Sequence, residues 1–134
     1  MQGLSNMDYN QYHYQLLVSL FEQIQHMAPF NSDNFSAQDH AFAHNFKQLI
    51  TMEKDETFFG LGQQLICQIV AAYPHITPKI PRDLLWYFSG DCMHFLNDEE
   101  IDLYSQLDDM RFEAEQSGQD FNMVEARANL KKLH

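Results

Sequence analysis

The segment from Pro78 to Leu107 constrains the fold more than any other part of this chain. Pro81 precedes a short stretch, Leu84–Phe88, that is apolar on every side, and a Gly-Asp-Cys-Met-His sequence then interrupts the pattern. Proline is favoured in the first turn of a helix, and a helix with no polar face has to be buried. We therefore predict a short helix over about residues 81–89 at the centre of the hydrophobic core.

Hydrophobic periodicity of about 3.6 residues recurs along almost the whole chain, and strand-like alternation never lasts beyond about four residues. On the first helical stretch, His13 falls on the same arc as the leucines. The other predicted helices lie before and after residues 81–89. The full set covers 8–27, a helix capped by Ser36, about 56–73, about 81–89, a helix from Asn97 to Ser117, and a last one after Asn122. The pattern predicts an all-α protein, a compact bundle of five or six helices in a single domain over residues 1–134.

Local signals mark several helix ends. Ser36 with Asp39 three residues later, and Asn97 with Glu100, each have the spacing of a capping box or a close relative of it. Inside the third helix, Gly60 and Gly62 each cost about 1 kcal/mol relative to alanine. A close approach of a neighbouring helix explains such glycines, and we predict one here.

The formal net charge of −11 limits the partners of the chain. Binding to nucleic acid or to anionic lipid requires lysines and arginines, so we expect neither a nucleic-acid nor a membrane partner. The first residues lack the pattern of a signal peptide, no apolar run reaches the about 18 residues of a membrane span, and Cys67 and Cys92 form no CxxC pair. These features predict a cytoplasmic protein with reduced cysteines.

Asp91, Cys92 and His94 form the most suggestive group of reactive side chains, because they fall at the break that follows the apolar helix. A carboxylate and an imidazole three residues apart can form half of a metal site or an oriented acid–base pair, and the cysteine could supply a thiolate. The alternative is structural: an aspartate that caps a turn, a cysteine packed in the core, and a histidine bound to a backbone carbonyl. We predict no bound cofactor.

Trp86 is the only tryptophan, and we include it among the candidate ligand-binding residues. Because it lies between Leu85 and Tyr87 in an apolar helix, we expect it to be mostly buried against the first and third helices. A third interpretation of the segment is a pocket for an apolar ligand, formed by the many phenylalanines and tyrosines.

His40 and His44 have metal-binding spacing, but they fall opposite the apolar stripe, so we expect two exposed histidines.

Ile101 and Phe112 share one side of the fifth predicted helix, roughly opposite its inward stripe, which centres on Leu107. If the last helix does not cover them, they form an apolar contact surface in an acidic rim. Residues 98–120 carry nine acidic residues and one basic residue, Arg111. A DNA mimic needs such a stripe, but a solvated helix face needs it equally.

We therefore predict a non-enzymatic protein-interaction or regulatory module whose partner is another protein or a second copy of the chain, with a homodimer favoured. The alternative is a metal-dependent or thiol-based site around Asp91, Cys92 and His94. The sequence contains no P-loop, Rossmann fingerprint, GxSxG or HExxH motif, which leaves catalysis undecided.

Overall fold

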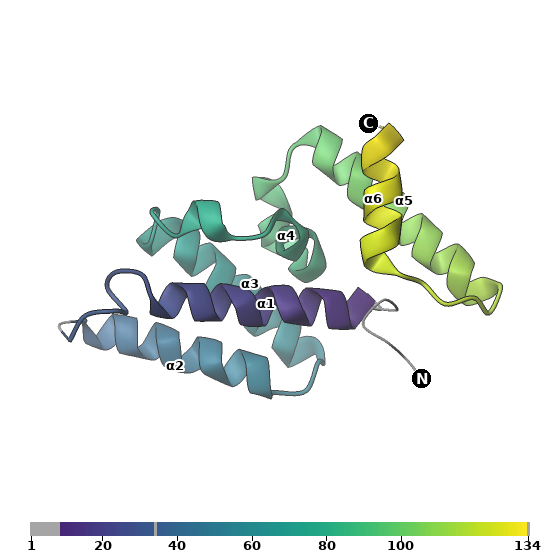
Figure 1. Ribbon diagram of the computed structural model, residues 1–134. Coiled ribbons are helices and arrows are strands. Elements are labelled where there is room, and N and C mark those ends of the chain that lie inside the picture. Colours follow the sequence, from purple (N-terminus) through teal and green to yellow (C-terminus); the bar gives the residue numbers. More distant parts are fainter. Residues whose placement is uncertain (1–8, 34, 134) are drawn as a thin grey trace.

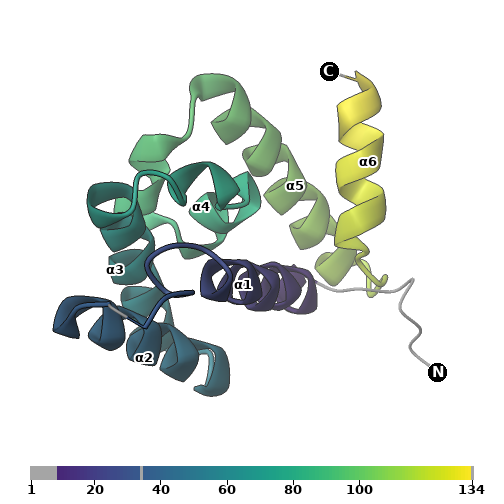
Figure 2. The ribbon, with the colours of Figure 1, turned by 60° about the vertical axis from the view of Figure 1, so that its left-hand side comes forward.

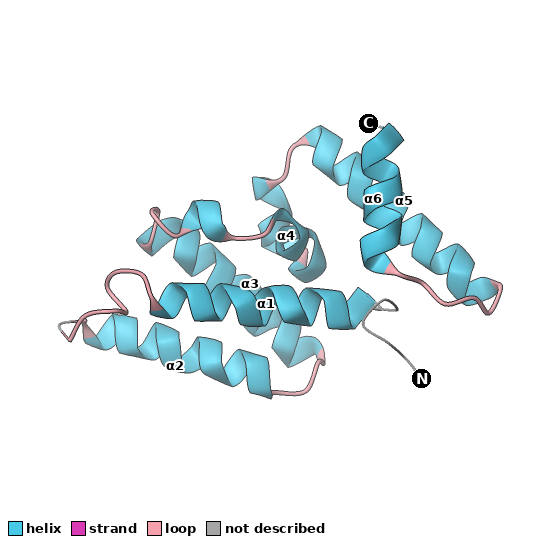
Figure 3. Cartoon of the chain, viewed as in Figure 1, coloured by secondary structure: helices cyan, strands magenta, loops and turns pink. Residues whose placement is uncertain are grey.

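The computed structural model describes residues 9–33 and 35–133, and the side chains among these up to residue 129. Figure 1 shows the elements in chain order. They are α1 (Tyr9–Gln25), α2 (Ala37–Thr51), α3 (Glu56–Ala72), the 3₁₀ helix η1 (Thr77–Lys79), α4 (Arg82–Phe88), the 3₁₀ helix η2 (Gly90–Phe95), α5 (Asp98–Gln116) and α6 (Met123–Leu133). Figure 3 shows that these described residues contain no strand, which confirms the predicted all-α class.

The helices form a body and an arm (Figures 1 and 2). In the body, α1 packs against α2, and α3 packs against both α2 and α4. In the arm, α5 and α6 form a hairpin that joins the body through contacts of α5 with α4 and of α6 with α1. The far end of α5 projects away from the body in both views.

The short helix α4 lies at the centre of the core, as its sequence predicts. It contacts α1, α3, α5 and η2, and Leu84, Leu85, Tyr87 and Phe88 are all buried. The helix ends at Phe88 because Ser89 and Gly90 both have positive φ angles, of 53° and 57°. Such angles turn the chain out of a right-handed helix.

The predicted helix starts are confirmed by hydrogen bonds. The backbone N–H of Asp39 donates to Ser36 Oγ at 3.1 Å, and the N–H of Glu100 donates to Asn97 Oδ1 at 2.8 Å. In both cases the acidic side chain accepts from the backbone N–H of its cap residue, which completes a capping box. The Asn122 side chain caps α6 through the N–H of Glu125.

The prediction for Trp86 was wrong in its partners. The side chain is only partly buried, its ring stacks on Tyr104 of α5 with centroids 5.7 Å apart, and its Nε1 donates to Asp108 Oδ2 at 3.1 Å. The side of α4 that faces α1 and α3 is instead occupied by Tyr87 and Phe88. An indole needs a partner for its N–H, and the Asp108 carboxylate at the edge of the core supplies one.

Among the described helices, none combines the length and the apolar character that a membrane crossing requires.

Candidate functional site

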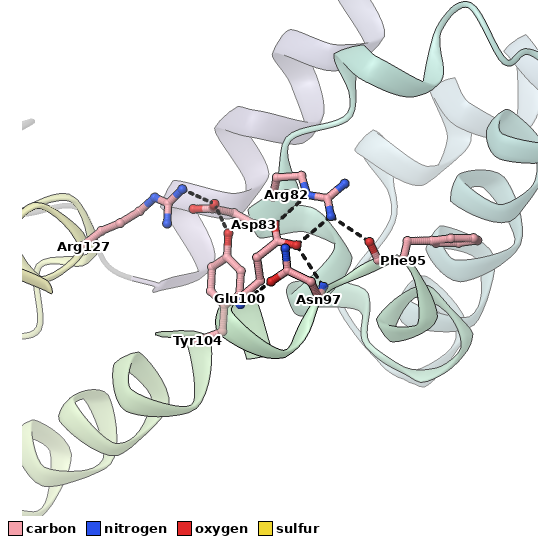
Figure 4. A network of polar contacts seen from close by, with 7 residues as sticks. All are labelled: Arg82, Asp83, Phe95, Asn97, Glu100, Tyr104 and Arg127. Atoms are coloured by element: carbon pink, nitrogen blue, oxygen red, sulfur yellow. Dashed lines mark hydrogen bonds and ion pairs between the residues drawn. The ribbon is translucent and has the colours of Figure 1, made fainter. Parts of the chain in front are cut away.

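A group of buried and partly buried polar side chains lies where α1, α4, α5 and α6 meet, and we call it the Asp83 cluster. Its members are Tyr12, His13, Asp83, Tyr104 and Arg127. Asp83 is only 3% exposed. Its Oδ2 accepts from the Tyr12 hydroxyl at 2.7 Å, and its Oδ1 accepts from the Tyr104 hydroxyl at 2.5 Å. Figure 4 shows Arg127 of α6 pointing at the same carboxylate, with Nη2 2.9 Å from Oδ1.

The two tyrosines of the cluster act as fixed hydrogen-bond donors. Burial, and then the hydrogen bond to the Asp83 carboxylate, raise the pKa of both Tyr12 and Tyr104 well above the ordinary tyrosine value. Each hydroxyl therefore keeps its proton and donates a hydrogen bond to Asp83. A buried carboxylate needs such partners, because leaving water without them is costly.

Arg127 supplies the positive charge of the cluster from the last helix. Its side chain is 21% exposed, and its guanidinium carbon lies 5.6 Å from the centre of the Tyr104 ring. Its Nη1 is buried and has no hydrogen-bond partner among the described residues. The ion pair with Asp83 is thus formed by one of the two terminal nitrogens.

His13 is fully buried next to this ion pair. Its Nδ1 lies 2.7 Å from the backbone oxygen of Tyr9, and since a carbonyl oxygen can only accept, Nδ1 carries the proton. The ring stacks on Tyr87 with centroids 4.4 Å apart. Burial lowers the pKa of His13 to about 4, so the imidazole is neutral near pH 7. Its Nε2 has no partner among the described residues.

A second ion pair lies beside the cluster but faces solvent. Arg82 Nε donates to Glu100 Oε2 at 2.6 Å, and its Nη2 donates to Glu100 Oε1 and to the backbone oxygen of Phe95, each at 2.7 Å (Figure 4). The Arg82 side chain is 50% exposed. Neighbouring residues of α4 therefore carry one exposed and one buried ion pair.

The structure separates the three reactive side chains predicted at the break, all of which belong to η2. Cys92 is fully buried, and its thiol lies 3.9 Å from the backbone oxygen of Gln63. Burial raises the pKa of Cys92 to about 12, so the thiol stays protonated near neutral pH. Asp91 and His94 are exposed. In the part of the chain that is described, no three His, Cys, Asp or Glu side chains gather to hold a metal ion.

The two predicted interface residues behave differently. Phe112 is 61% exposed on α5, and α6 does not cover it. Ile101 is partly buried and packs against the core, so it lies outside any apolar surface around Phe112. On α6, Val124 is 51% exposed.

The sequence reasoning missed the Asp83 cluster as a site. One signal was present, because Asp83 directly precedes the apolar run Leu84–Phe88 in a helix predicted to be central. A carboxylate in that position has to find donors. The identity of the donors was hidden, since they come from α1, α5 and α6. His13, in contrast, lies on the predicted apolar arc and is buried as expected.

Comparison with known proteins identified a family. The model of the PA2817-like family matches residues 5–134 of the chain. No curated protein and no solved structure matches it.

Proposed function

We propose that this chain, which belongs to the PA2817-like family, is a non-enzymatic interaction module that binds a basic segment of a partner protein through the outer face of α5. The outer face consists of Phe112 and exposed neighbours on α5, of which Asp109, Glu115 and Gln116 are at helical spacing and Glu113 is adjacent in sequence. The observation that carries the proposal is the 61% exposure of Phe112 in this acidic setting.

An exposed aromatic ring within a carboxylate rim fits a particular kind of partner. Aromatic residues are enriched at the centres of protein interfaces, where burial of their apolar surface favours association. The ring face also attracts a guanidinium or an ammonium, and the surrounding carboxylates add to that attraction. The net charge of −11 would steer a basic segment toward the protein before contact.

The outer face keeps its negative charge because the one basic residue of α5 is engaged elsewhere. The Arg111 guanidinium lies 4.1 Å from the centre of the Tyr9 ring on α1. It also lies 3.7 Å from Asp108 and 3.4 Å from Glu115. Among the rim carboxylates, only that of Glu115 is thus partly neutralised from within α5.

The homodimer predicted from the sequence stays a second candidate. It requires the faces around Ile101 and Phe112 of two copies to meet, and the packing of Ile101 on the core reduces the apolar part of that surface. Two acidic outer faces also repel each other. A basic partner could cover the same surface without this charge repulsion, so we favour a basic partner over a homodimer.

Binding of a labelled amphipathic peptide of lysines and leucines, followed by fluorescence anisotropy, tests the proposal. We expect the wild-type protein to bind it and Phe112→Ser to bind it at least about tenfold more weakly, as at an interface hot spot. Val124→Ser removes the other large apolar side chain that is exposed among the described residues, and it serves as the matched control, which should keep wild-type affinity.

Equal binding by wild type and Phe112→Ser would overturn the proposal, as would equal affinity for a glutamate–leucine peptide of the same length. Light scattering at micromolar concentration should show a monomer. A wild-type dimer that Phe112→Ser converts to a monomer would instead support the homodimer and count against a basic partner.

A metal site on η2 is the third candidate. Asp91 and His94 are both exposed, and side chains three residues apart project from the same side of a 3₁₀ helix. The thiol-based version is not supported, because Cys92 is buried and protonated. If the site exists, Asp91→Asn should weaken Zn²⁺ binding in a calorimetric titration while helix content is unchanged. Stoichiometric binding that survives loss of both Asp91 and His94 would exclude this location.

A further inference from the structure

We propose that the Asp83 cluster is a receptor for a guanidinium group, which Arg127 occupies from within the same chain. We further propose that an arginine of the basic partner competes with Arg127 for this receptor and thereby displaces α6. The second part depends on the proposed function. The receptor itself does not, and it can be tested alone.

The receptor is built before any cation enters it. Asp83 is 3% exposed, and each of its oxygens accepts a hydrogen bond from a tyrosine hydroxyl, of Tyr12 on one side and Tyr104 on the other. These bonds come from α1 and α5, so they persist when α6 is removed. A carboxylate oxygen can accept about two hydrogen bonds, which leaves acceptor capacity directed toward Arg127.

The surroundings favour a guanidinium over an ammonium. The group is planar, weakly hydrated and able to lie over an aromatic ring, and the Arg127 guanidinium carbon lies 5.6 Å from the centre of the Tyr104 ring. Without a cation, Asp83 would be an unpaired charge inside the protein, which is strongly unfavourable. A structure that releases Arg127 therefore needs another cation in its place.

The contact made by Arg127 is incomplete, which leaves room for a competitor. Nη2 lies 2.9 Å from Asp83, but Nη1 is buried without a hydrogen-bond partner among the described residues. An arginine that approaches from outside, free of the helix geometry, could use both nitrogens as a fork. Among the described side chains of α6, only Met123 and Ala126 are buried.

Chemical rescue tests the receptor. Arg127→Ala should have a lower Tm than wild type, and millimolar methylguanidinium should raise that Tm because it binds the folded state only. Methylammonium at the same concentration controls for ionic strength and for charge alone, and it should have little effect. Wild type, whose receptor is filled, should not respond, and neither should the Asp83→Asn, Arg127→Ala double variant.

A response of the double variant, or no response of Arg127→Ala, would overturn the receptor. If Arg127→Ala does not fold, Arg127→Lys provides the same readout, since it keeps the charge but loses the planar fork. Arg127→Lys should then respond to methylguanidinium in the same direction with a smaller shift.

The competition is tested with two peptides that differ only in arginine or lysine alternating with leucine. The arginine peptide should bind Arg127→Ala about tenfold more tightly than wild type, because α6 no longer competes. The lysine peptide should bind both proteins alike. Equal affinity of the arginine peptide for both proteins would refute the competition, and rescue by methylguanidinium would then identify a receptor for small guanidinium compounds. If Phe112→Ser leaves peptide binding intact while methylguanidinium still rescues Arg127→Ala, the proposed binding through the outer face is refuted and the guanidinium receptor is supported.

Discussion

Replacement of Asp83 by alanine is expected to destabilise the protein by about 3–5 kcal/mol, as for other buried ion pairs that lose one partner. The change removes the acceptor of two tyrosine hydroxyls and of Arg127 together. All three groups would then be left in or near the core without their partner. Urea denaturation monitored by circular dichroism measures the effect as a shift in the midpoint at constant slope.

Arg82→Ala is the matched control for this experiment, because it removes the other ion pair from the adjacent residue of the same helix. The Arg82 side chain is 50% exposed, and solvent screens its interaction with Glu100. We expect a cost of about 1 kcal/mol or less. Similar losses for the two variants would show that burial of the Asp83 cluster does not govern its contribution to stability.

Gly62→Ala is expected to destabilise the fold by about 1–3 kcal/mol, as other overpacked cores do. A Cβ atom added at this position would lie 2.1 Å from Cε1 of Phe88, far inside the normal contact distance. Phe88 is itself buried, so its ring cannot move away without disturbing the core. The same denaturation experiment, with near-ultraviolet circular dichroism to follow aromatic packing, measures the loss.

Gly60→Ala provides the opposite expectation two positions earlier in α3. No atom lies within 4 Å of a Cβ built there. The substitution should stabilise the protein by about 1 kcal/mol through the higher helix propensity of alanine. A stabilised Gly62→Ala would contradict the close packing of α3 against Phe88, and a destabilised Gly60→Ala would contradict the open space at that position.

Features that depend on neighbours in the sequence could be predicted from the sequence alone. The capping boxes at Ser36 and Asn97 need only residues three positions apart, and both are present. The helix around residues 81–89 needed only its flanking proline and the absence of a polar face. Its observed bounds, Arg82–Phe88, agree with the prediction.

Features that depend on which helices meet could not be predicted in the same way. Gly60 and Gly62 have the same interpretation when judged from the sequence, but of the two only Gly62 closely faces another helix. Trp86 and Asp83 are both on α4, but their partners are on α5, α1 and α6, and no spacing along the chain identifies them. The candidate receptor was missed for this reason. The helical period of α5 placed Phe112 and Ile101 on one side, but only Phe112 is exposed, because Ile101 packs against the core.

The central position of α4 also determines the order in which parts of the core can form during synthesis on the ribosome. The faces of α1 and α3 that carry His13 and Gly62 contact residues of α4, and these are made only after most of the body has emerged. Until then, the two helices lack the surface that covers them. Asp83 gains its positively charged partner later still, because Arg127 belongs to α6, which is synthesised after α5. The buried ion pair of the core therefore forms only after α6 has been synthesised.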